Sequence, residues 1–295
     1  MTDKKLEKEI NTLKKNTGIN LDLHDFSGAN LEFIAEQLKK INRAYMEKYD
    51  QNYFWKNVFL SRMRKTEIIE QAKSFGIPWD GRFELFIIKA KHEISATAYE
   101  ILNQLFPVQL YNYIVKLEED TAVLIHHVHD IDVHDIADCI RDTLNTEAMM
   151  YVCVSYSENS YRLEELNIAY TKVSRAMAIG KMFYYQKNIY LFEQMGTGEM
   201  IYSLDKDTCN RFLNSIKGRD ELEKFDSELI HTVDCFLENN LNIAETSRQV
   251  HMHRNTLIYR IEQIQKKTGL DIRKFDDAMT FRLAGMVLKV KDMED

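Results

Sequence analysis

The chain has 295 residues, of which 45% are hydrophobic, and its formal net charge is −7. This length accommodates two domains and a connecting segment, and the composition is ordinary for a globular protein. No apolar run approaches the length of a membrane span, and the charged residues 1–10 do not resemble a secretory signal. The four cysteines have no CxxC spacing, so we expect reduced thiols in a cytoplasmic protein rather than disulfides or a zinc ribbon.

Residues 1–80 are predicted to form a mostly helical N-terminal segment with a dimerisation or regulatory role. Apolar residues at spacings of three and four indicate a helical seam of barely two heptads: Leu31, Ile34, Leu38, Ile41 and Tyr45. A seam this short either packs on a neighbouring domain or contributes to a dimer interface. A further helix is expected over residues 60–80, leading into the first strand.

Residues 81–195 are predicted to form an α+β domain. The composition of residues 83–90 is that of a buried strand, and Pro107 ends a helix over residues 95–106. Later elements are a hairpin, two helices and two strands: 111–116 with 121–128, 136–144, 149–155, 161–182 and 189–192. Alternating strands and helices around one hairpin predict a ferredoxin-like α/β sandwich with a split βαβ pattern. Residues 196–220 are expected to be a linker to a C-terminal all-α domain over residues 221–295.

Four histidines lie close together in this domain, at positions 126, 127, 129 and 134, among the acidic residues Asp130, Asp132 and Asp135. In a strand, His127 and His129 share one face while His126 faces the other, so only part of the group could converge on a metal ion. We therefore favour surface histidines. The sequence predicts no metal site, no cofactor and no catalytic residue.

The stretch from residue 243 to residue 270 is typical of a helix-turn-helix. Asn242 can cap a helix over residues 243–250, with Glu245 placed as in a capping box. This helix is expected to bury its residues at positions 243, 244, 247 and 250, the small Ala244 and Ser247 allowing close approach of a second helix. The turn is predicted over residues 251–253, with Met252 pointing inward. A second helix follows over residues 254–268 and is ended by Gly269.

The second helix has an apolar side and a polar leading edge. Leu257, Ile258, Ile261 and Ile264 are predicted to face inward. In such motifs the first turn of the second helix meets base edges in the major groove. His253 and Arg254, with Asn255 behind them, are therefore predicted to read bases, while Thr256, Tyr259 and Arg260 hold phosphates.

The local charge agrees with this interpretation. Residues 253–275 contain six Lys or Arg and two Asp or Glu, so this window carries +4 in a chain of −7. A basic face on an acidic chain is the pattern of a DNA-binding domain joined to a regulatory body, although a solvated helix face gives the same charge count.

The run from His251 to Ile264, the following Thr-Gly-Leu-Asp-Ile and an acidic-capped helix over residues 276–290 closely resemble the C-terminal domain of PucR/CdaR-type bacterial transcription regulators. In that family the domain is a Fis-like helix-turn-helix, and the resemblance covers about residues 222–288. The matching positions are His253, Arg254, Asn255, Thr256, Leu257, Tyr259 and Arg260. Ile258 stands where the family often has a basic or polar residue, so one backbone contact is expected to be missing.

The order of elements in residues 81–195 resembles the degenerate GGDEF-like domain that precedes the helix-turn-helix in this family. Active cyclases of that fold carry two glycines and adjacent carboxylates in the hairpin turn. The corresponding turn here, residues 117–121, has no glycine, so we expect no nucleotide cyclisation. The resemblance implies a ligand-responsive activator that binds double-stranded DNA as a homodimer and responds to a small-molecule effector. The alternative is a nucleotide-binding or enzymatic GGDEF-like sensor with a DNA-binding output.

Overall fold

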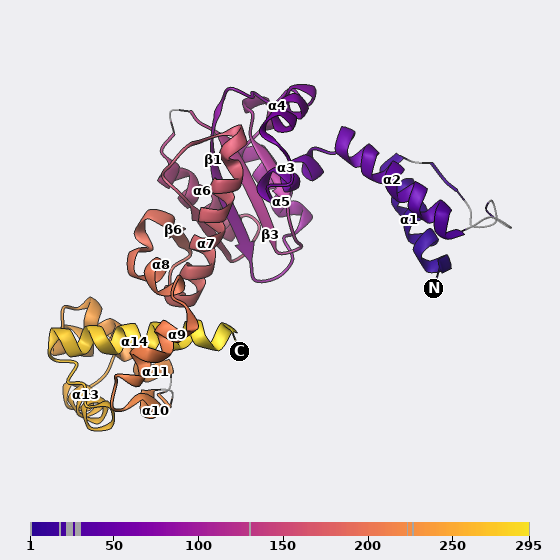
Figure 1. Cartoon of the computed structure of the whole chain (residues 1–295). Helices are drawn as coiled ribbons and strands as arrows, with labels where there is room; N and C mark the ends of the chain where they lie inside the picture. The colour runs from indigo at the N-terminus through magenta and orange to yellow at the C-terminus, as the bar shows by residue number, and fades with distance from the viewer. Residues whose placement is uncertain are drawn as a thin grey trace. The chain divides into compact units, whose positions relative to one another are not determined.

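The computed structural model describes residues 2–17, 19–21, 26, 31–129, 131–222, 224–225 and 227–294. The chain divides into two compact units, the first of residues 1–177 and 187–193 and the second of residues 178–186 and 194–295 (Figure 1). The α+β class with a helical C-terminal region is confirmed. The domain boundaries proposed from the sequence remain a prediction. Across the described residues, no helix combines the length and apolar content that a bilayer span requires.

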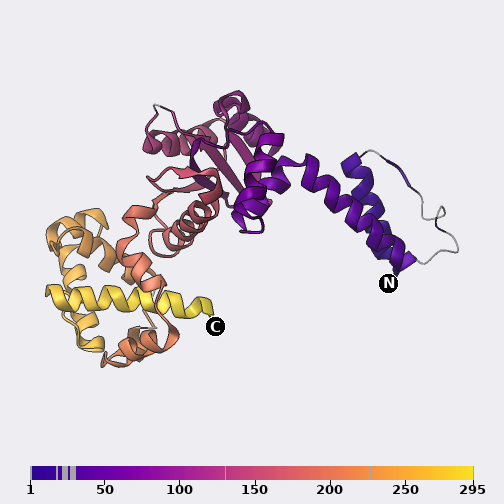
Figure 2. The same ribbon diagram turned by 45° about the horizontal axis from the view of Figure 1, so that its top comes forward.

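The N-terminal helices α1 (Thr2–Thr17) and α2 (Leu31–Tyr49) lie side by side (Figures 1 and 2). Their shared core contains Leu6, Ile10, Leu13, Ala35 and Leu38. The Asn42 amide donates to the Glu9 backbone oxygen at 3.0 Å, which links α2 to α1. The apolar neighbour of the predicted seam is thus α1. Ile41, predicted to belong to that seam, is 53% exposed, because Ala35, Leu38 and Asn42 form the buried stripe instead.

Helices α3 (Gln51–Phe59) and α4 (Lys65–Ser74) lead into the sheet. The Asp50 carboxylate caps α3 by accepting from the backbone N–H groups of residues 52 and 53. Trp55 of α3 packs against Tyr113 with ring centroids 5.1 Å apart. Phe59 stacks on Tyr170 at 5.0 Å. The aromatic side of α3 therefore joins the core of the first unit.

The first unit is built around a six-stranded sheet. Its strands are β1 (Arg82–Ala90), β2 (Tyr113–Lys116), β3 (Thr121–His127), β4 (Val152–Tyr156), β5 (Tyr161–Arg162) and β6 (Ile189–Leu191). The spatial order is β2-β3-β1-β4-β6, with β5 paired to β1. Among the strand pairs of the described residues, β4–β6 is parallel and the other four are antiparallel. The central β1 is apolar and buried along nearly its whole length, as its composition predicts.

Helices cover the sheet on both faces. One face packs against α5 (Ala96–Leu105) and α6 (Val133–Thr146), whose Leu102 and Ile140 join Phe86 of β1 in a common core. On the opposite face the Ser155 hydroxyl donates to the Val173 oxygen of α7 (Leu166–Phe183) at 2.9 Å. The order β1–α5–β2–β3–α6–β4 has the predicted split βαβ connectivity. Its relation to the GGDEF-like fold remains a prediction.

Several predicted elements begin later than expected. Helix α4 starts at Lys65 rather than at residue 60, and β2 starts at Tyr113 rather than at residue 111. Strand β4 starts at Val152 rather than at residue 149, because Met149 is exposed and has a left-handed φ of 50°. The helix predicted over residues 161–182 starts at Leu166. Residues 161–162 pair with β1 instead, and the Glu165 carboxylate accepts from the Arg162 backbone N–H at 3.1 Å. Short 3-10 helices cover Val108–Leu110, Leu163–Glu165 and Phe192–Gln194.

The second unit is helical. After the end of α7, its helices are α8 (Gly196–Tyr202), α9 (Lys206–Asn214), α10 (Arg219–Leu222), α11 (Ser227–Glu238), α12 (Ile243–Gln249), α13 (Arg254–Thr268) and α14 (Phe275–Glu294). The predicted linker, residues 196–220, contains α8 and α9, and its Ile201 and Leu213 lie in the same core as Val287 of α14. This segment is therefore folded into the second unit, since its apolar residues complete that core.

Candidate nucleic-acid interface

The helix-turn-helix begins at α12. The Asn242 side-chain oxygen accepts from the backbone N–H groups of Ala244 and Glu245, at 3.0 and 3.3 Å, which confirms the predicted cap. The predicted capping box is wrong in one part. The Glu245 carboxylate pairs with Arg248 one turn later, at 2.5 Å, because both side chains lie on the exposed face of α12.

The turn between α12 and α13 forms over residues 250–253. His251 has a left-handed φ of 50°, and the Met252 backbone N–H donates to the Ser247 oxygen at 2.9 Å. The Met252 side chain packs against the core, as predicted. His253 is the N-cap of α13, where its Nδ1 accepts from the Asn255 backbone N–H at 3.2 Å. This hydrogen bond places the proton of the neutral ring on Nε2, which leaves Nε2–H as the outward donor.

Helix α13 is anchored by its apolar side. Leu257, Ile261 and Ile264 are buried, while Ile258 is half-buried. From α12, the fully buried residue is Thr246. The prediction that Ala244 is buried is wrong, because α12 is rotated so that Thr246 faces the core and Ala244 faces solvent. The last turn of α13 ends at Gly269, whose φ of 79° is the left-handed conformation that favours glycine.

The opposite side of α13 is polar and exposed. Arg254, Asn255 and Thr256 occupy its first turn, and all three are exposed. Tyr259 follows one turn later and is 60% exposed. Five of the six predicted contact residues are thus exposed in the turn and the first turns of α13: His253, Arg254, Asn255, Thr256 and Tyr259. A guanidinium, an amide, two hydroxyls and an imidazole N–H can between them hydrogen-bond base edges and phosphate oxygens.

Arg260, the sixth predicted contact residue, lies in a different environment. Its Nη2 donates to the Glu228 carboxylate of α11 at 2.7 Å, and its Nη1 donates to the Thr232 hydroxyl at 3.3 Å. The Arg260 side chain is 26% exposed, whereas that of Glu228 is 69% exposed. Arg260 therefore braces α13 against α11, and part of its hydrogen-bonding capacity is already engaged.

A second cation of the basic window is also engaged. Arg273 forms a bidentate contact with Asp271, at 2.7 and 3.0 Å, and donates to Gln265 at 2.9 Å. Hydrogen bonding to Arg273 lowers the pKa of the Asp271 carboxyl. The positive charge of the 253–275 window is therefore partly neutralised by internal pairs, and its outward charge is carried by four exposed residues, Arg254, Lys266, Lys267 and Lys274.

The histidine cluster of the first unit separates into distinct contacts. His126 Nδ1 lies 3.1 Å from the Glu84 carboxylate in a buried pair, and His129 Nε2 lies 3.3 Å from the Leu110 oxygen. His127 is half-buried, and its burial lowers the pKa of its imidazole. Asp130 lies outside the described residues. Among the residues that are described, no three His, Cys, Asp or Glu side chains are placed to hold a metal ion.

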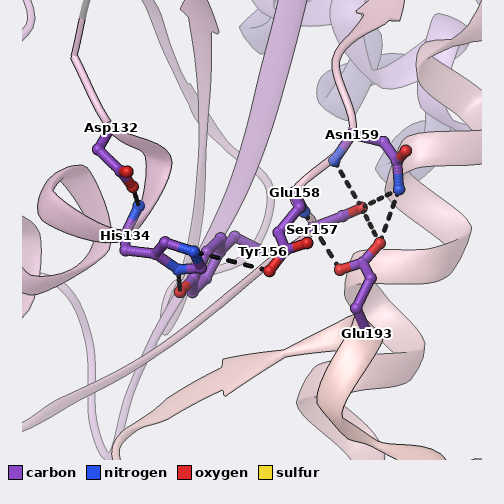
Figure 3. Close-up of polar contacts among 7 residues, drawn as sticks. All are labelled: Asp132, His134, Tyr156, Ser157, Glu158, Asn159 and Glu193. Atoms are coloured by element: carbon purple, nitrogen blue, oxygen red, sulfur yellow. Dashed lines mark hydrogen bonds and ion pairs between the residues drawn. The ribbon is translucent and has the colours of Figure 1, made fainter.

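His134 belongs to a different polar network, at the ends of β4 and β6 (Figure 3). Its Nδ1 lies 2.6 Å from the Tyr156 hydroxyl, and its Nε2 lies 3.6 Å from the Glu158 carboxylate. Burial raises the pKa of Tyr156 to about 12, so the phenol is protonated at neutral pH and donates to Nδ1 in the tautomer whose proton is on Nε2, facing Glu158. Asp132 fixes the start of α6 by accepting from the His134 backbone N–H at 2.8 Å.

Glu193 completes this network (Figure 3). One of its carboxylate oxygens accepts from the Ser157 hydroxyl and the Asn159 amide, each at 2.7 Å. The other oxygen accepts from the Glu158 backbone N–H at 3.1 Å. These contacts attach the loop after β4 to the segment after β6, so the network is explained by its structural role.

The acidic hairpin turn predicted between β2 and β3 is also accounted for by internal contacts. Asp120 lies 3.2 Å from the Lys89 ammonium and accepts from the Thr121 hydroxyl at 2.6 Å. The Glu119 and Asp120 backbone oxygens accept from the Ile94 and Ala90 N–H groups at 2.8 and 2.9 Å. The turn thus stabilises the end of β1.

Comparison with known proteins agrees with the geometry of the second unit. Residues 229–287 match the PucR C-terminal helix-turn-helix domain. The chain is 22% identical to a purine catabolism regulatory protein of Bacillus subtilis over 84% of its own length and 50% of the relative. It is 19% identical to the DNA-binding transcriptional activator AdeR of the same organism, over 83% of this chain and 60% of that one. A carbohydrate diacid regulator of Escherichia coli is 27% identical over 39% of this chain and 30% of its own length.

The chain spans about half the length of the first of these relatives. The match therefore does not assign the complete activity of these relatives to this chain. The matched segment contains α12, the turn and α13, together with most of α11 and α14. Residues 229–287 therefore form a PucR-type helix-turn-helix domain, which confirms the resemblance of this chain to the PucR/CdaR-type transcription regulators.

Proposed function

We propose that this protein is a sequence-specific DNA-binding transcription regulator. The observation that carries the proposal is the first turn of α13, where Arg254, Asn255 and Thr256 are exposed on a helix whose other side is anchored in the core by Leu257 and Ile261. A helix held in this way can enter the major groove with its N-terminal turn leading. The match of residues 229–287 to a helix-turn-helix domain supports the same function.

The six interface residues divide into two roles. Arg254 has the donors for a bidentate contact with guanine, and Asn255 can pair with adenine. His253 offers its Nε2–H to a base acceptor, because its Nδ1 is used to cap α13. Thr256, Tyr259 and Arg260 are assigned to phosphate oxygens, which fix the register of the helix on DNA. Arg260 reaches a phosphate only by sharing or leaving Glu228.

We further infer that the protein acts as a homodimer and as an activator in the cytoplasm. One helix-turn-helix reads only a few base pairs, so two copies on paired half-sites supply the required specificity. Relatives named as transcriptional activators support the direction of control. The first unit then serves as a non-catalytic, GGDEF-like module that receives a small-molecule effector, and the protein needs neither metal nor cofactor for DNA binding.

The test is a fluorescence anisotropy titration of the purified chain against promoter fragments from its own genome, with selected fragments repeated over a salt series. Arg254→Ala should cost about 1–3 kcal/mol on the selected site, or roughly 5- to 150-fold in affinity, while non-specific binding changes little. Arg64→Ala is the matched control, since it removes one exposed cation from the first unit. Unchanged sequence preference in Arg254→Ala would show that α13 does not read bases.

A further inference from the structure

A cleft of about 370 Å³ opens in the first unit between α3, α5 and β2. Its wall is made by three aromatic side chains, Trp55, Tyr99 and Tyr113, together with amide side chains and Lys116. The volume falls at the lower end of the range of small-molecule sites, and it accommodates a molecule of one or two rings. The cleft lies entirely within the first unit and contains none of the proposed DNA contacts.

The aromatic rings give the cleft flat apolar surfaces. The Trp55 and Tyr113 rings pack with centroids 5.1 Å apart. Both side chains are almost fully buried, which fixes their orientation. Tyr99 lies on α5, and the Lys116 ammonium is 5.9 Å from the centroid of its ring. Tyr99 is half-buried, so it supplies most of the aromatic surface on which a planar π-system can stack in preference to a bulky saturated one.

Two buried polar atoms of the cleft residues lack hydrogen-bond partners. They are the Trp55 indole Nε1 and the Tyr99 hydroxyl oxygen. The indole N–H is only a donor, so an oxygen or nitrogen acceptor must satisfy it. Burial raises the pKa of Tyr99 to about 12, so its hydroxyl is also a donor at neutral pH. Leaving a buried donor unpaired is unfavourable, and an incoming acceptor removes that penalty.

The neighbouring amides are, in contrast, already engaged. The Asn112 side-chain oxygen accepts from the His127 backbone N–H at 3.2 Å, and its amide donates to the Pro107 oxygen at 3.4 Å. The Asn52 amide donates to the Lys116 backbone oxygen at 3.3 Å. The unsatisfied groups are thus confined to the aromatic side chains. Both atoms are covered in this structure, so a ligand oxygen would contact them only with a rotation of a neighbouring side chain, which is part of the proposal below.

The charge of the cleft is small and positive. Lys116 is the charged residue among those that line it, and its ammonium lies 3.6 Å from the Glu93 carboxylate, with both side chains about half exposed. This weak, solvent-screened pair can be exchanged for an anionic ligand group at little cost. A carbonyl or carboxylate oxygen is therefore favoured at the cleft, and a cationic ligand is disfavoured.

We propose that this cleft is a binding site for a small planar ring molecule that carries a carbonyl or carboxylate oxygen. The ring packs against Trp55, Tyr99 and Tyr113, and the oxygen accepts from the Trp55 indole or the Tyr99 hydroxyl. Lys116 at the rim attracts the carboxylate form.

The chain contains two tryptophans, Trp55 and Trp79, so indole N–H signals give a direct assay. Protein labelled with 15N-tryptophan would be titrated with benzamide and benzoate, and Trp79→Phe assigns the two signals. Either probe should move the Trp55 indole proton downfield and leave the signal of the exposed Trp79 in place. Toluene lacks the acceptor and cyclohexanecarboxamide lacks the flat ring, so neither should produce this shift. Stronger binding of benzoate than of benzamide assigns the ligand to the carboxylate class.

A matched pair of variants tests the hydrogen bond. Tyr99→Phe should weaken probe binding about three- to tenfold, whereas Tyr111→Phe removes an exposed hydroxyl outside the cleft and should have no effect. Circular dichroism checks that both variants are folded. Absence of a Trp55 shift with either probe at about 10 mM, or an equal shift with cyclohexanecarboxamide, would overturn the proposal. The titration contains no DNA, so a negative result does not affect the proposed DNA-binding function. A negative result for DNA binding likewise does not affect the proposed ligand site in the cleft.

Discussion

The ion pair between Arg260 and Glu228 provides a sharp test of the proposed interface. The guanidinium donates to the carboxylate at 2.7 Å, and the Glu228 side chain is 69% exposed beside α13. In DNA-bound protein, a phosphate would compete with this carboxylate for Arg260. We therefore expect Glu228→Gln to tighten DNA binding, because the glutamine amide holds the guanidinium less strongly and repels no phosphate.

The size of the effect follows from the exposure of the pair. Ion pairs of this kind contribute about 0.2–1 kcal/mol, so releasing Arg260 should raise DNA affinity by a factor of about 1.4 to 5. If Arg260 then neutralises one more phosphate, the slope of log K against log salt should steepen by about 0.9.

The assay is the anisotropy titration on the selected site between about 50 and 300 mM salt, where the slope is measured directly. Glu221→Gln on α10 is the matched control, since it also removes one negative charge and one 2.7 Å ion pair, which Glu221 forms with Lys224. Its slope should equal that of the wild type. If Glu228→Gln binds no tighter than the wild type, or if both variants share one slope, Arg260 does not contact phosphate.

Two further predictions concern stability. A Cβ at Gly218 would overlap the backbone at the end of α13, around Thr268, so Gly218→Ala should destabilise the second unit by about 1–3 kcal/mol, whereas Gly285→Ala meets no atom within 4 Å and should stabilise α14 by about 0.5–1 kcal/mol. Urea unfolding followed by circular dichroism measures the free energy of unfolding of both variants. Changes of the same sign in the two variants would refute this packing. Burial raises the pKa of the half-buried Asp234, and an acid with a raised folded pKa destabilises the fold above its unfolded pKa. Asp234→Asn should therefore raise the Tm at pH 7 and lose that advantage below about pH 4; a constant gain across this range would contradict the assignment.

The sequence predicts those parts of the interface that depend on local signals. Helix α13 begins and ends where it was predicted, because the cap at His253 and the left-handed Gly269 are encoded next to the helix itself. The rotation of α12 was predicted incorrectly. A helix of seven residues has only two turns, so its periodicity does not decide between Ala244 and Thr246 as the buried residue.

Contacts between distant positions could not be predicted from one sequence. Glu228 lies 32 residues before Arg260, and nothing in the local pattern of α13 indicates that its second arginine is paired. The cleft likewise depends on α3, α5 and β2, which become neighbours only when the sheet forms. The sheet itself was predictable in its element order, since each strand and helix carries its own periodicity, although β5 was too short to be recognised.

The path of the chain between the two units limits how the protein can be dissected. The chain enters the second unit within α7, returns to the first unit at residue 187 for β6, and enters the second unit again at residue 194. Met182 and Phe183 of α7 pack against the helical core. A fragment starting at residue 194 would expose that part of its core to water, and a fragment ending at residue 177 would lack the edge strand β6. Neither half can be produced by a single cut without leaving behind a piece that the other half needs, so function is best studied on the intact chain.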